Sequence, residues 1–134
     1  MKKILFTLIF SLVTLATHQV DGESYKIRTI ENRAFREGEV LKFKLHYGFI
    51  NAGIGELRVM DRAVNIGGKE CLHVVATGRS ISSFDWFFKV RDKFETYIDK
   101  QAMVPWKFAK DVYEGGYVFK DAYRFDHHSN IVHV

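Results

Sequence analysis

Apolar and polar residues alternate along much of this chain with a period of two. The clearest case is residues 40–47, where Leu41, Phe43, Leu45 and Tyr47 fall on one side. Such alternation predicts a half-buried β-strand. Further strands are predicted at residues 54–61, 70–77, 90–98, 104–113, 117–126 and 131–134, and residues 62–66 either continue the strand before them or begin another.

Glycine and polar residues separate these predicted strands. Gly67-Gly68 predicts a two-residue hairpin turn, because glycine readily adopts the positive φ angles of such turns. A three-residue loop is predicted at 114–116, a glycine-rich connection at 48–53 and a polar turn at 127–130. Short connections of this kind join antiparallel neighbours.

The region around residues 80–88 departs from the alternating pattern. Ile81, Phe84, Phe87 and Phe88 are spaced to share one face of a helix, and the serines before them can cap it. An alternative is a strand that ends at residues 86–88. We expect a mainly β fold, a curved antiparallel sheet or half-open barrel, with one short helical segment near residues 80–88.

The first residues predict export. Two lysines precede a run of thirteen uncharged, mostly apolar residues, 4–16. That length fits the core of a signal peptide and is short for a transmembrane helix, which needs about 20 residues. We predict a signal peptide at residues 1–22, cleaved after Gly22 or alternatively after Ala16, and a single β domain at 23–134. Because residues 131–134 stop within a predicted strand, we expect this domain to be truncated at its C-terminus.

Composition narrows the classes of function. The formal net charge is +4 with both signs interspersed, which gives little support for binding nucleic acid. Cys71 is the only cysteine, so it cannot form an internal disulfide, and its strand-like surroundings predict a small buried apolar side chain. His127 and His128 lack the spacing of a zinc site, and no cofactor or metal is expected.

Two carboxylates interrupt apolar faces of predicted strands. Asp92 lies among Val90, Phe94 and Ile98, and Asp121 lies between Phe119 and Tyr123. A buried carboxylate needs a cation or several hydrogen-bond donors. Either the two form a polar site with Arg79 or Arg91 nearby, or they form structural ion pairs at strand ends. An enzyme would require both carboxylates to converge in an open cleft.

The aromatic cluster of Phe84, Trp86, Phe87 and Phe88 is the most distinctive local feature. It could form a wall of an apolar ligand pocket, or a patch for a membrane or a partner. Alternatively it could be a plug that fills the end of a curved sheet. We take this cluster, with Arg91, Asp92 and Asp121, as the candidate ligand-binding residues. No catalytic motif is present.

Four segments together resemble a bacterial family of exported proteins, the domain of unknown function 3108. They are residues 38–43, 47–53, 84–92 and 114–117, and the resemblance covers about residues 37–134. It implies a curved antiparallel sheet in a periplasmic or outer-membrane-associated protein of Gram-negative bacteria. The implied sheet is similar to folds that carry lipoproteins or lipid between membranes. The family supplies no catalytic residues.

From pattern and resemblance we expect a non-enzymatic envelope protein. It would bind a lipid or other apolar ligand on a curved sheet, with only peripheral membrane contact and no nucleic acid. The alternative is a structural or assembly partner of another envelope protein, without a small-molecule ligand.

Overall fold

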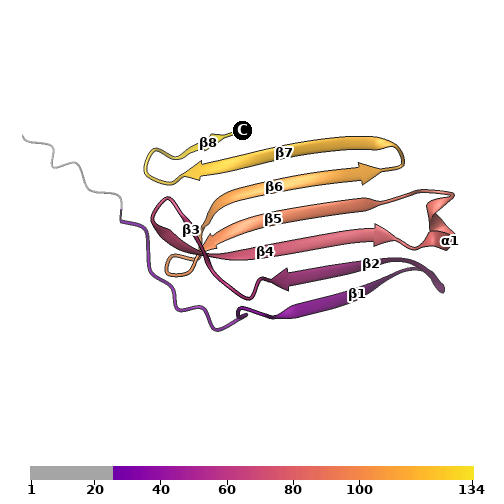
Figure 1. Cartoon of the computed structure of the whole chain (residues 1–134), viewed down its shortest axis with the longest axis horizontal. Helices are drawn as coiled ribbons and strands as arrows, with labels where there is room; N and C mark the ends of the chain where they lie inside the picture. The colour runs from indigo at the N-terminus through magenta and orange to yellow at the C-terminus, as the bar shows by residue number, and fades with distance from the viewer. Residues whose placement is uncertain (1–25) are drawn as a thin grey trace, which may run out of the picture.

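The computed structural model describes residues 26–134, which form one antiparallel sheet with a single short helix (Figure 1). The predicted signal peptide, residues 1–22, lies outside the described residues. The elements in chain order are β1 (Val40–Tyr47), β2 (Ile50–Val59), β3 (Val64–Ile66), β4 (Lys69–Ser80), α1 (Ser82–Asp85), β5 (Arg91–Asp99), β6 (Pro105–Glu114), β7 (Tyr117–Asp126) and β8 (Ile131–His133).

The sheet is open. Its strands follow the order β1-β2-β4-β5-β6-β7-β8, with β3 paired to β4, so β1 and β8 are the two edges. Neighbours along this path are close in sequence and antiparallel, as the short predicted turns require. The predicted fold class is confirmed: a mainly β, unclosed antiparallel sheet with one short helical segment.

Two turns test the glycine predictions. Gly67 and Gly68 have positive φ angles of 57° and 84° in the turn between β3 and β4, as predicted. The loop at 114–116 is shorter than predicted, because Glu114 pairs with Tyr117 and leaves only two residues in the turn.

The glycine-rich segment 48–53 is mostly strand, which corrects its prediction as a connection. β2 begins at Ile50, and Gly53 pairs with both Leu45 and Ser80. A register shift between Leu45 and His46 marks an irregularity in the β1–β2 ladder. The pairing of both neighbouring strands prevails over the low strand propensity of glycine.

The buried core lies at one end of the sheet. Val59, Leu72 and Val74 are its buried members, and the partly buried Phe35, Leu57 and Ile98 pack against them. Cys71 is fully buried on the opposite face of β4, as predicted for a small apolar side chain, and burial raises the pKa of its thiol. The core is small, so most of the sheet has an accessible surface.

Within residues 26–134, no helix has the length and apolarity needed to cross a membrane.

Candidate functional site

The strand registers divide the sheet into an apolar and a polar face. Leu41, Leu57, Ala76 and Phe94 are direct cross-strand neighbours, so they share one face. Alternation then defines what we call the apolar face. Its apolar members are Leu41, Phe43, Leu45, Leu57, Val59, Leu72, Val74, Phe94, Ile98, Phe108, Val112, Phe119 and Tyr123. The same registers also place Ser80, Asp92, Lys110 and Asp121 on this face.

The centre of the apolar face is shallow because its residues are small. Gly55 of β2 pairs with Phe43 of β1 on one side and with Gly78 of β4 on the other. The side chain of Phe43 lies beside Gly55, where an added Cβ would be 3.7 Å from the Phe43 Cβ. Small residues of β2 and β4 therefore lie between the large side chains of β1 and those of β5 and β6.

The segment before β1, residues 26–39, covers one end of the apolar face. We call it the leader segment. Its backbone is tied to the sheet by Ile30 N–H to Gln101 O at 2.8 Å and Gly38 N–H to Val59 O at 3.0 Å. Phe35 supplies its main apolar contact with the core. Phe35 was not predictable as a core residue, because the polar and charged residues around it show no alternating pattern.

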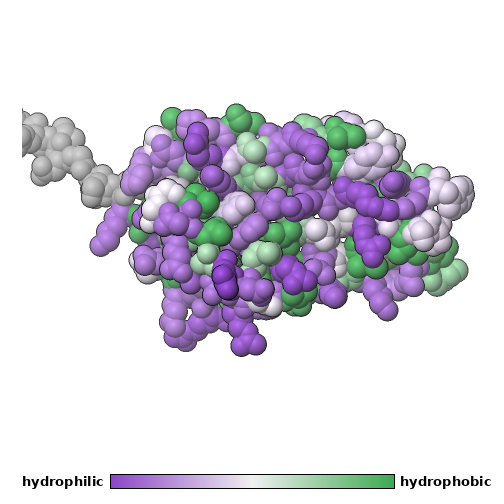
Figure 2. Space-filling model, viewed as in Figure 1, coloured by the Kyte–Doolittle hydropathy of each residue, from purple (hydrophilic) through white to green (hydrophobic). Residues whose placement is uncertain are grey.

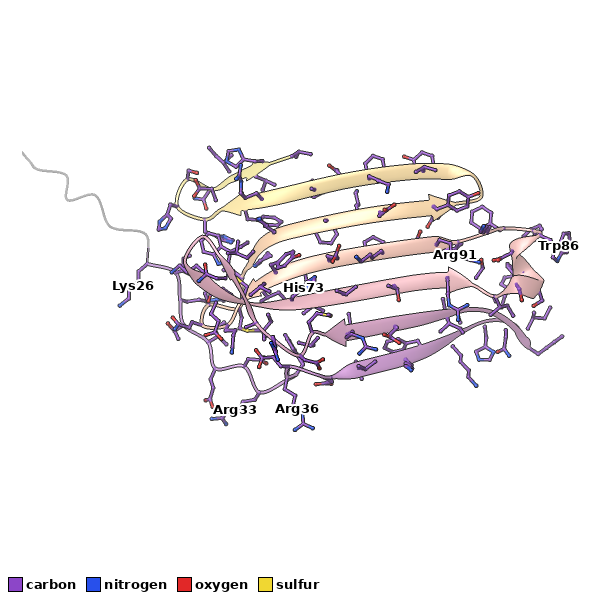
Figure 3. The ribbon with its side chains drawn as sticks, in the orientation of Figure 1. Lys26, Arg33, Arg36, His73, Trp86 and Arg91 are labelled. Atoms are coloured by element: carbon purple, nitrogen blue, oxygen red, sulfur yellow. The ribbon has the colours of Figure 1, made fainter. Side chains whose placement is uncertain are left out.

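Ion pairs support this attachment. Lys100 Nζ donates to Glu37 at 3.3 Å and to Glu70 at 2.9 Å, and these hydrogen bonds raise the pKa of Lys100. Figure 3 shows Lys26, Arg33 and Arg36 at this end of the molecule, far from Trp86. The leader segment therefore forms a charged outer layer over an apolar interior.

An apolar cavity lies beneath the leader segment. Its volume is about 370 Å³, and the lining residues are Ala34, Phe35, Glu39, Leu41, Leu57, Val59, Val74 and Ile98. Glu39 is the only ionisable lining residue, and its carboxylate accepts a hydrogen bond from Arg36 N–H at 3.2 Å. Because Leu41 and Leu57 belong to the open apolar face, the cavity continues onto that face.

The predicted aromatic cluster lies at the opposite end, in the connection between β4 and β5. The helical alternative is confirmed: α1 is one turn, although its first flanking residue is Ile81 rather than a capping serine. Trp86 is 84% exposed and Phe87 is 69% exposed, so the plug interpretation does not hold for them. Figure 3 shows Trp86 beyond the end of the strands.

A polar clamp holds this connection in place. Arg91 donates to Asp85 through two nitrogens, at 3.1 and 2.5 Å, in the bidentate geometry that suits guanidinium and carboxylate. Ser80 Oγ donates to the same carboxylate and accepts Val90 N–H at 2.8 Å. The Arg91 and Ser80 hydrogen bonds lower the pKa of Asp85, and Asp85 raises the pKa of Arg91.

Arg91 is thus committed to Asp85. Sequence reasoning missed both Asp85 and Ser80 as its partners. One sequence signal could have indicated this pair. Arg91 follows Asp85 by six residues, and the connection between them is short enough to bring the two side chains together.

Asp92 and Asp121 are not brought together. Asp92 lies on β5 and accepts Tyr113 N–H at 3.2 Å, where the β5–β6 ladder is ending. Asp121 lies on β7 and accepts hydrogen bonds from Ala122 N–H, at 3.0 Å, and from Tyr123 Oη. β6 lies between their strands, and the registers also offset them by two residues, so more than two strand spacings of about 4.8 Å separate their backbone positions. Each serves local structure, so this arrangement offers no paired acid and base.

His127 and His73 also have structural partners. His127 Nε2 lies 2.7 Å from Pro105 O, and its ring packs edge-on against Trp106. His73 stacks on Tyr97 and lies 3.1 Å from Glu95. Within residues 26–134, no three His, Cys, Asp or Glu side chains converge in a way that could hold a metal ion.

Comparison with known proteins identifies a family. No curated protein and no solved structure matches the chain. A family model described as protein of unknown function (DUF3108) matches residues 42–134, which include every strand from β2 to β8 and most of β1. The chain therefore belongs to the DUF3108 family.

Proposed function

We propose that this protein is an exported envelope protein that binds an apolar chain, such as the acyl chain of a lipid, without catalysing a reaction. The bound chain would start in the cavity beneath the leader segment and extend along the apolar face. The observation that carries the proposal is the continuity of that cavity with an uncovered apolar surface.

The exposure of β1 supports this proposal. Leu41, Phe43 and Leu45 lie on the apolar face and are 44%, 50% and 51% exposed. Burial of apolar surface contributes about 25 cal/mol per Å², so a ligand laid against this row gains a favourable free energy. Contiguous exposed apolar patches commonly mark binding surfaces.

The cavity supports a small ligand at this place. Its volume of about 370 Å³ is within the usual range for ligand pockets, roughly 300–1,000 Å³, and its walls are almost wholly apolar. An acyl chain matches a small apolar cavity that adjoins exposed apolar side chains.

Assembly by strand addition to β1 has less support. The outer edge of β1 carries Lys42 and Lys44, both exposed. Lysines on an edge strand discourage pairing with another strand. The candidate ligand residues of the aromatic cluster lie at the far end, so they are not part of the proposed cavity.

Displacement of a dansyl-labelled undecanoic acid by palmitate tests the proposal. Ala34→Trp places a large side chain into the cavity from the exposed leader segment, and we expect probe affinity to fall at least about tenfold. Arg33→Trp introduces the same side chain next to the cavity lining and should leave affinity unchanged. Equal affinity in both variants, or native protein isolated without any bound lipid, would contradict the proposal.

Export is the second part of the proposal. It rests on the basic start and the apolar run of residues 4–16. Cell fractionation should place the protein in the envelope, with a mass that lacks residues 1–22 or 1–16. Retention of the full-length chain in the cytoplasm would contradict export while leaving ligand binding open to its own test.

A further inference from the structure

Three connections of the sheet meet at one end of the molecule (Figure 1). They are the β1–β2 turn, the β4–β5 connection with α1 and the β6–β7 turn. Ile81 N–H donates to Ala52 O at 3.1 Å, and Gly115 N–H donates to Lys89 O at 2.9 Å. These hydrogen bonds join the three connections into one continuous end of the sheet.

This end carries a group of exposed aromatic residues, which we call the aromatic tip. Its members and their exposed fractions are Phe49 (100%), Trp86 (84%), Tyr47 (77%), Phe87 (69%) and Tyr117 (62%). Apolar side chains reach the surface at the α1 end in the space-filling view (Figure 2). No segment within residues 26–134 covers them, so folding alone does not explain why they are aromatic.

Two basic side chains that form no ion pair with a described residue lie beside the aromatic tip. Arg79 and Lys89 are exposed, and both line a surface hollow of about 460 Å³ on the polar face beside the tip. Within the described residues Arg79 has no ion pair or hydrogen bond through its side chain. Lys89 Nζ lies 5.7 Å from the centre of the Tyr113 ring.

The acidic residues around this hollow have other partners. Asp85 pairs with Arg91, Asp92 accepts Tyr113 N–H, and Asp111 pairs with Lys120 at 2.6 Å. Glu114, at the end of β6, is the exposed acid that remains at this end. The positive charge of Arg79 and Lys89 is therefore available to an anionic partner.

We propose that the aromatic tip docks on the surface of a lipid bilayer that contains anionic lipids. Tyrosine and tryptophan favour the interface between bilayer and water, where the ring is apolar and its polar group stays hydrated. Lysine and arginine beside them are attracted by anionic headgroups. Aromatic side chains thus supply insertion, and Arg79 and Lys89 supply the preference for negative charge.

The shape of the tip favours a bilayer over a protein partner. The aromatic residues belong to separate turns at the extremity of the sheet and do not line a groove. A planar bilayer contacts all three connections at once without shape complementarity. The clamp of Ser80, Asp85 and Arg91 holds Trp86 and Phe87 outward, in the orientation that insertion needs.

This proposal is independent of the cavity at the other end of the sheet. Docking at the tip would place the open end of the apolar face close to lipid, which suits the function proposed above. Failure of vesicle binding would leave the cavity proposal intact, and failure of palmitate binding would leave docking intact.

Co-sedimentation with vesicles tests docking. The probes are phosphatidylcholine vesicles with and without phosphatidylglycerol. We expect the purified chain to bind the anionic vesicles more tightly and its tryptophan emission, to which Trp86 and Trp106 contribute, to shift to shorter wavelength. The Phe49→Ser/Trp86→Ser variant should lose most vesicle binding, and its fold should be unaffected because both side chains are exposed.

Charge is tested separately. Arg79→Gln/Lys89→Gln should weaken binding to anionic vesicles roughly thirtyfold, about fivefold for each basic side chain, and the difference should shrink at high salt. Lys107→Gln/Arg124→Gln removes the same charge from exposed, paired positions near the core end and should bind as the parent does.

A matched apolar control completes the design. Ile131→Ser/Val132→Ser alters two half-exposed residues on the β8 edge and should leave vesicle binding unchanged. Equal loss in this control and in the tip variant would overturn the proposal. The proposal would also be overturned if the parent chain did not bind vesicles, or if the Phe49→Ser/Trp86→Ser variant bound them as tightly as the parent.

Discussion

Leu72 of β4 and Leu45 of β1 lie on the same face of the same sheet, yet Leu72 is 4% exposed and Leu45 is 51% exposed. The difference comes from what lies above them. The core end is covered by the leader segment through Phe35, whereas no described segment covers β1 towards the aromatic tip. Alternation therefore specifies the face on which a side chain lies, and coverage by another segment decides whether it is buried.

The largest expected effect is at Leu72. Leu72→Ala should lower the free energy of unfolding by about 2–5 kcal/mol, because it removes a buried side chain and leaves a cavity. Leu45→Ala removes the same atoms from an exposed position and should change the free energy of unfolding by less than about 1 kcal/mol. Urea denaturation followed by circular dichroism measures both. Equal losses would mean that the apolar face is covered in solution.

The fold was largely predictable from the sequence because strand alternation and glycine turns are local signals. Strand order followed from short connections between neighbours. The extent of β2 was not predictable, since the pairing of Gly53 with Leu45 and Ser80 depends on two other strands.

The candidate site was only partly predictable. The aromatic cluster was found as a pattern, but its exposure depends on how the β4–β5 connection leaves the sheet. The pairing of Arg91 with Asp85 is a tertiary contact, and so is the packing of Phe35 on the core. Sequence reasoning therefore did not predict that Arg91 pairs with Asp85, and its role towards a ligand stays a prediction.

The clamp provides the second prediction. Ser80→Ala should lower the free energy of unfolding by about 1–3 kcal/mol, because it removes the side-chain acceptor of the Val90 N–H group and a donor to Asp85. Ser83→Ala is the matched control: Ser83 is exposed in α1, and its loss should matter by less than about 0.5 kcal/mol.

Amide hydrogen exchange separates this effect from general destabilisation. The Val90 amide should exchange faster in Ser80→Ala, while amides around Val74 keep their relative protection. Uniform acceleration across the sheet would contradict a local clamp. Similar stability of the two serine variants would show that the hydrogen bonds of Ser80 contribute little.

The smallest expected difference compares two glycine turns, one at each end. Gly115 and Gly67 have nearly equal φ angles of 56° and 57°, so alanine at either position costs about 1–2 kcal/mol of backbone strain. Their surroundings differ. A Cβ on Gly115 would come within 2.4 Å of the Phe88 ring, whereas nothing lies within 4 Å of a Cβ on Gly67.

Phe88 is 43% exposed, so its ring can rotate towards solvent and the additional loss of stability in Gly115→Ala should be below about 1 kcal/mol. The distinguishing result is structural: near-ultraviolet circular dichroism of the aromatic residues should change in Gly115→Ala and stay as in the parent in Gly67→Ala. If both spectra stay the same, Phe88 does not pack on the β6–β7 turn. The arrangement of the aromatic tip would then depend on the clamp of Ser80, Asp85 and Arg91 without support from this turn.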